Sequence, residues 1–192
     1  ALGGNQLRSS YWTGTAWVNL TNVSFISPGA IYWVTLKADP VTDDLQAVIT
    51  NGPELRTMYW SGSTWTLSSM IDPGLDATAG RTVDFEWNST GSIGKLVWDT
   101  DLAGTTLNQT TCSPQCSGAG SSTISTYGDT GRFIELYRNP ASADAVKILA
   151  GRRDSVSTVD SNIGSFMWTR ASSYTNYGDT ALTTETVVGL GE

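Results

Sequence analysis

The stretch LRTMYWSGSTWT, residues 55–66, decides the fold because the chain carries a near copy of it 48 residues earlier. Residues 7–18 read LRSSYWTGTAWV and place Leu, Arg, Tyr-Trp, Gly and a second Trp at the same offsets. In each copy, short runs rich in β-branched and aromatic residues flank a Ser/Thr-Gly pair, a pattern typical of a β-hairpin. The repetition predicts an architecture built from one repeated supersecondary unit.

A second repeated marker places the period near 50 residues. The tetrapeptide YGDT begins at Tyr127 and again at Tyr177. The segments SPGAIYWVTLKAD (27–39) and TAGRTVDFEWNST (78–90) also match, because each has a turn followed by an alternating strand. Predicted strand starts therefore recur near Ala30, Arg81, Arg132 and Ala181.

Each repeat is expected to contain about four short strands. LQAVIT, KLVWDT and AVKILA follow polar turns and supply the second strand of three successive units. The Trp hairpin supplies the third and fourth strands, and the slots near 105–117 and 155–170 keep its place without its Trp pair. Four-stranded repeats of this length are typical of β-propeller blades, so we expect a small all-β propeller-like array of about four blades. A β-sandwich is the alternative fold.

We expect a single domain over residues 1–192 with incomplete repeats at its two ends. Residues 1–29 form a half repeat and 182–192 a closing strand, around full repeats at 30–80, 81–131 and 132–181. Such ends are expected to complete each other within one chain or between copies. Exchange between copies is head-to-tail and gives rings or fibres. A homo-oligomer or filament is therefore one expected partner state.

The composition argues against several function classes. The net charge is −7, and the 11 basic residues form no cluster, which argues against nucleic-acid binding. No apolar run approaches 18 residues, so we expect no membrane-spanning segment. The chain has no His, which excludes Ser-His-Asp and Cys-His catalysis.

Carboxylates are the remaining candidates for catalysis. The acidic residues considered for glycoside hydrolysis are Asp43, Asp44, Asp72, Asp99, Asp101 and Glu135. Most of them lie in or beside Gly/Pro/Ser turns, where Asp bonds to its own backbone. The segment DTDLAG (99–104) partly resembles a calcium loop, but Ala103 and Thr110 stand where oxygen ligands are needed. We predict a protein that is not an enzyme and binds no metal or cofactor.

Two cysteines and four sequons indicate a secreted or cell-surface protein. Cys112 and Cys116 lack the other ligands that zinc needs and the Cys-x-x-Cys redox spacing, so we expect a disulfide across a short loop. A disulfide indicates an oxidising compartment. Candidate glycosylation sites are Asn19, Asn22, Asn88 and Asn108.

The two Trp hairpins resemble the hairpin that recurs in fucose-binding β-propeller lectins, and GSTW (62–65) resembles the end of the Asp box of sialidase-like propellers. This resemblance implies a carbohydrate-binding module, with the candidate residues Arg8, Trp12, Trp17, Arg56, Trp60 and Trp65. The sequence departs from both patterns. Ser9 and Thr57 stand where the lectins have a sugar-binding Glu, and Trp12 and Trp60 where the Asp box has its Asp. Two functions are thus predicted: a self-assembling structural protein or, alternatively, a glycan-binding module.

Overall fold

The structure is a computed structural model, and all of the elements that it describes are β-strands. It describes residues 7–20, 29–52, 54–75, 81–99, 106–117, 122–125, 130–138, 145–153, 161–169 and 174–183. These ranges contain 14 strands and no helix, which confirms the predicted all-β class. None of the described segments is a helix with the length and apolar character needed to cross a membrane.

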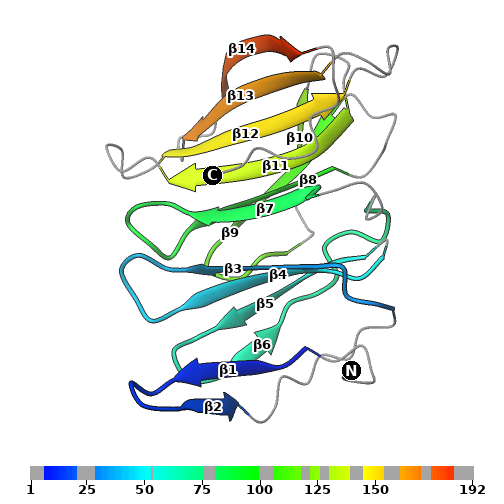
Figure 1. Cartoon of the computed structure of the whole chain (residues 1–192). Helices are drawn as coiled ribbons and strands as arrows, with labels where there is room; N and C mark the ends of the chain where they lie inside the picture. Colours follow the sequence, from blue (N-terminus) through cyan, green and yellow to red (C-terminus); the bar gives the residue numbers. More distant parts are fainter. Residues whose placement is uncertain are drawn as a thin grey trace.

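The strands form one hairpin and three four-stranded antiparallel sheets, and in each sheet the strands follow chain order (Figure 1). The N-terminal hairpin consists of β1 (Ser9–Trp12) and β2 (Trp17–Leu20). The first sheet consists of β3 (Trp33–Ala38), β4 (Leu45–Thr50), β5 (Leu55–Trp60) and β6 (Trp65–Leu67). The second sheet consists of β7 (Val83–Trp87), β8 (Gly94–Trp98), β9 (Thr106–Cys112) and β10 (Ser122–Ser125). The third sheet consists of β11 (Thr130–Arg138), β12 (Ala145–Arg153), β13 (Ser161–Thr169) and β14 (Tyr174–Thr183).

The predicted first and second strands agree with these sheets, whereas the slots near 105–117 and 155–170 each hold one strand, β9 and β13, and the fourth strands β10 and β14 follow them. The segments predicted as second strands are β4, β8 and β12, and each pairs with the first strand of its own sheet. The prediction fails near Ala181, which lies within β14 and pairs with Asn162 of β13. The second YGDT copy is thus part of a fourth strand, and no new unit starts at that point. The greater part of the predicted closing strand, residues 184–192, lies outside the described residues.

The quoted motif forms the predicted hairpin because each of its turns places a Gly where the backbone φ is positive. Gly62 has φ +81° and Gly14 has φ +98°. The turns are closed by hydrogen bonds from Ser61 N to Thr64 O and from Thr13 N to Ala16 O. A positive φ at the first central residue is the geometry of a type II′ turn, which suits the twist of antiparallel strands.

In this stack of sheets the first and second sheets pack face to face and β11 of the third sheet lies beside β7, with the N-terminal hairpin and the third sheet at opposite ends (Figure 1). The core between the first and second sheets includes Val48 and Leu55 on one side and Phe85 and Trp87 on the other. Phe85 and Trp87 pack edge-to-face with ring centroids 5.0 Å apart. Cys112 and Cys116 belong to the same core and form the predicted disulfide.

Candidate functional site

One face of the first sheet is only partly covered. Side chains alternate between the two faces of a strand, so the strand register defines which residues share this face. Ala47, Ile49 and Met58 lie on it and are buried against Leu7 and Trp65. We call it the hairpin-side face, since the chain around the N-terminal hairpin covers this part of it.

The uncovered part of the hairpin-side face lies on β3. Tyr32 and Val34 are 61% and 44% exposed. The residues at the same repeat positions in the second sheet, Val83 and Phe85, are 1% and 0% exposed. Their equivalents in the third sheet, Ile134 and Leu136, are both 0% exposed. These positions are therefore core positions where a neighbouring sheet covers them, and the first sheet has no such neighbour among the described residues.

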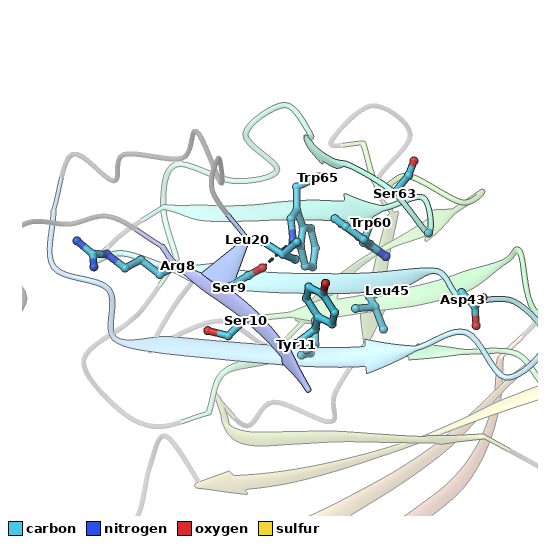
Figure 2. Close-up of a pocket in the computed structure, with 12 residues that line it drawn as sticks. Arg8, Ser9, Ser10, Tyr11, Leu20, Asp43, Leu45, Trp60, Ser63 and Trp65 are labelled. Atoms are coloured by element: carbon cyan, nitrogen blue, oxygen red, sulfur yellow. Dashed lines mark hydrogen bonds between the residues drawn. The ribbon is translucent and has the colours of Figure 1, made fainter. Parts of the chain in front are cut away.

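A cleft of about 820 Å³ lies between β1 and the hairpin-side face. Its floor carries Leu36, Leu45, Trp60 and Trp65, and Tyr11 of β1 stands over it. Figure 2 shows Trp60 and Trp65 side by side above Leu45. The two rings have centroids 5.6 Å apart and an interplanar angle of 52°. The floor is thus mainly apolar and aromatic.

The polar groups of the cleft lie mostly at its borders. Arg8 and Asp43 are at opposite ends (Figure 2). Trp65 Nε1 donates a hydrogen bond of 3.1 Å to Ser9 Oγ and ties the hairpin to β6. Ser10 and Ser63 complete the polar lining. Hydrogen-bonding groups therefore do not converge on one point of the floor.

The side of β1 away from β2 is an open strand edge. In an antiparallel pair the backbone groups of successive residues point alternately toward and away from the partner strand. Because Thr13 N bonds to Ala16 O at the turn, this alternation directs the backbone groups of Ser10 and Trp12 away from β2. No strand among the described residues pairs with them.

In the first sheet, the edge that is equivalent to the open edge of β1 is paired with another strand. β5 repeats the sequence of β1 and pairs with β4 along Leu55–Trp60. Tyr59 of β5 is 9% exposed, whereas Tyr11, its counterpart in β1, is 48% exposed. Tyr59 donates a 2.7 Å hydrogen bond to Asp44 Oδ2, and burial, with this bond, raises the pKa of Tyr59 to about 12.

The structure brings together three of the six residues predicted to bind carbohydrate. Arg8, Trp60 and Trp65 all line the cleft. Trp12 and Trp17 contact each other, with centroids 5.7 Å apart, but neither ring lines it. Arg56 forms an ion pair of 2.9 Å with Glu54 and does not line the cleft either. Four further lining residues were not predicted to bind carbohydrate: Tyr11 comes from β1, Leu36 and Leu45 from the paired strands β3 and β4, and Asp43 from the loop between them.

Most of the acidic residues considered for catalysis have structural partners. Asp72 accepts hydrogen bonds from Trp98 Nε1 at 2.8 Å and from Gly74 N at 2.7 Å. Glu135 forms an ion pair of 3.3 Å with Arg81. Asp99 is buried in the second sheet. Asp101 and Ala103 of the segment that partly resembles a calcium loop lie outside the described residues.

A partly buried group of charges joins the first strands of the three sheets. Arg81 contacts Asp84 at 2.8 Å, and Glu86 contacts Lys37 at 3.1 Å and Arg138 at 3.4 Å. Burial raises the pKa of both Asp84 and Glu86, and the neighbouring cations oppose this shift. Because the group joins neighbouring sheets, we assign it a role in holding the stack together.

The candidate glycosylation sites differ in accessibility. Asn19 is exposed on β2 and accepts a 3.0 Å hydrogen bond from Ser10 Oγ. Asn108 is half-buried, and Asn22 lies outside the described residues. Asn88 is fully buried, so a glycan does not fit there in the folded chain.

Comparison with known proteins adds no relative: neither the protein-family models nor the curated proteins contain a match to this chain. The likeness to lectin and Asp-box propellers therefore rests on the hairpin motif alone.

Proposed function

We propose that this chain is a non-enzymatic structural protein that self-assembles, with the hairpin-side face of the first sheet covered by another copy. The observation that carries this proposal is the contrast between equivalent repeat positions. Val34 is 44% exposed, whereas Phe85 and Leu136, its equivalents, are fully buried. Burying such apolar area contributes about 25 cal/mol per Å², so an uncovered core position favours association.

The repeated sheets also favour a head-to-tail contact. Each sheet contacts the next along the chain, and the hairpin and the third sheet lie at opposite ends of the stack (Figure 1). A contact that continues this stacking between copies uses two different surfaces, which gives rings or open fibres. In this proposal the sheets are blades of a propeller-like array that is completed by a neighbouring copy.

An extracellular location fits this function. The buried disulfide between Cys112 and Cys116 is suited to an oxidising compartment. We propose that the assembly is secreted or displayed on the cell surface.

The assembly is tested by measuring mass in solution over a range of concentrations by light scattering, followed by electron microscopy of the same samples. We expect the mass to increase with concentration and rings or fibres to be visible. Our candidate for the strand exchanged between copies is the segment 184–192, because it follows β14 in the chain as β7 follows β6. Removing residues 184–192 should therefore abolish these particles. Particles that persist unchanged after this deletion would exclude the segment as the exchanged strand and leave the assembly itself intact.

Carbohydrate binding is the second candidate function, and the aromatic cleft favours it. Trp60 and Trp65 line the cleft together with Arg8, and ligand pockets are typically lined by aromatic side chains with a few polar or charged groups. Trp60→Phe should then remove glycan retention on an array and preserve folding, whereas Trp12→Phe, outside the cleft, should have no effect. Equal retention by the wild type and Trp60→Phe would argue against this function.

A further inference from the structure

We propose that the cleft beside β1 is an acceptor groove for a β-strand of a second copy of this chain. The incoming strand pairs with the open edge of β1 in the way that β4 pairs with β5. This inference rests on the assembly proposed above, and it specifies which backbone and which side chains make the contact.

The backbone of β1 supplies the pairing groups. Ser10 and Trp12 direct their N–H and C=O groups away from β2, and in the described structure no strand accepts them. Met58 and Trp60 hold the equivalent positions in β5, where Ala47 and Leu45 of β4 lie opposite them. The repeat thus provides its own template for the missing strand.

The floor of the cleft supplies the apolar contacts. Leu36 is 56% exposed and lines the cleft together with Leu45 and Trp60. A β-strand presents every second side chain to one face, so a strand beside β1 would lay alternate apolar residues on this floor. Main-chain pairing with side-chain pockets at alternate positions is the general mode of strand addition.

The chemistry of the cleft favours a strand over a sugar. Recognition of a sugar needs several hydrogen-bonding groups that converge on one ring. Here Arg8 and Asp43 lie at opposite ends, and the floor between them carries leucines (Figure 2). An extended segment can reach both ends and cover the apolar floor between them.

A second copy is the occupant that the repeat itself indicates. The strand that occupies the matching edge of β5 is β4, a strand of this same chain. The third sheet lies at the far end of the stack from the cleft (Figure 1). A head-to-tail neighbour can therefore bring an edge strand of its third sheet, such as β14, to β1.

The test compares Ser10→Pro with Ser10→Ala in the full chain. Proline removes the N–H that points to the open edge and leaves the bonds between β1 and β2 intact, and proline is tolerated on edge strands. We expect Ser10→Pro to raise the concentration needed for assembly about tenfold or more, since it removes a backbone bond and obstructs the edge. Ser10→Ala keeps the N–H and should assemble as the wild type does.

A second pair of variants covers the case in which Ser10→Pro does not fold. Tyr11→Lys places a charge in the groove, and Val18→Lys places the same charge opposite it on β2, outside the cleft. Only Tyr11→Lys should block assembly. If Ser10→Pro and Tyr11→Lys both fold and assemble as well as the wild type, the proposal of an acceptor groove is overturned, while the proposal of assembly stands. A wild type that stays monomeric and binds an oligosaccharide through Trp60 would overturn both proposals.

Discussion

Val34 and Phe85 occupy the same position in successive repeats, 51 residues apart, yet Val34 is 44% exposed and Phe85 is fully buried. The second sheet has the first sheet packed against Phe85. Among the described residues, the corresponding face of the first sheet has the chain around the N-terminal hairpin packed against β4 and β5, and β3 stays exposed. This difference underlies the proposed function.

The same pair gives a stability prediction. Phe85→Ala should destabilise the fold by about 3–5 kcal/mol, because it opens a cavity in the core. Val34→Ala should change the stability of the monomer by less than about 0.5 kcal/mol, as is usual for an exposed position, but should weaken assembly. Urea denaturation at a concentration below that of assembly checks both values. A large loss of monomer stability in Val34→Ala would show that this face is already covered within the chain.

The buried charges predict a pH-dependent effect of Lys37. Lys37→Met removes the cation 3.1 Å from Glu86 and should cost roughly 1–3 kcal/mol at pH 7, because a half-buried cation is lost beside a buried carboxylate. Burial raises the pKa of Glu86 in the folded state, so acidification protonates Glu86 in the folded chain before the unfolded chain. The loss of stability caused by Lys37→Met should therefore shrink between pH 7 and pH 5 in urea titrations. The double variant with Lys37→Met and Glu86→Gln should lose less stability than Lys37→Met alone. A cost that is independent of pH would contradict this role.

For Lys95 we predict the opposite effect, namely that removing the charge stabilises the folded protein at pH 7. Burial lowers its pKa to about 8, from 10.5 in the unfolded chain. Below pH 8 the folded protein holds a buried ammonium, and Lys95→Met should stabilise it by roughly 1–3 kcal/mol. Between pH 8 and about 10.5 only the unfolded chain keeps this proton, so wild-type stability should rise and the advantage of the variant should disappear. Thermal unfolding at pH 7 and pH 10 checks this, and an equal advantage at both values would contradict it.

The sequence predicted the first three strands of each unit because each strand is short and bounded by turn formers, but the fourth strands β10 and β14 lie beyond the slots predicted for them. It predicted the hairpin well because Gly14 and Gly62 stand where a positive φ is required. It failed near Ala181, where the repeated YGDT continues β14 since pairing with β13 extends through it. A shared tetrapeptide gives the period of a repeat but not the strand that follows it.

Half of the predicted carbohydrate-binding residues lie elsewhere for a related reason. Trp12 and Trp17 copy Trp60 and Trp65 in sequence, and both pairs have similar ring geometry. Only the second pair faces another strand, because it lies in the sheet that the hairpin covers. Leu36 and Asp43 line the cleft because the N-terminal hairpin lies over the first sheet, a tertiary contact that no local motif encodes.

Hydrogen exchange as a function of protein concentration tests the contact between copies most directly. The amides of Ser10 and Trp12, which point away from β2, should exchange rapidly in dilute solution and become protected as the protein assembles, while the amides of β4, which is paired on both sides, stay protected throughout. Protection of Ser10 and Trp12 that increases with concentration is the predicted result. Exchange of these two amides that is identical at every concentration, while particles are present, would contradict the proposal that another copy covers this side of the molecule.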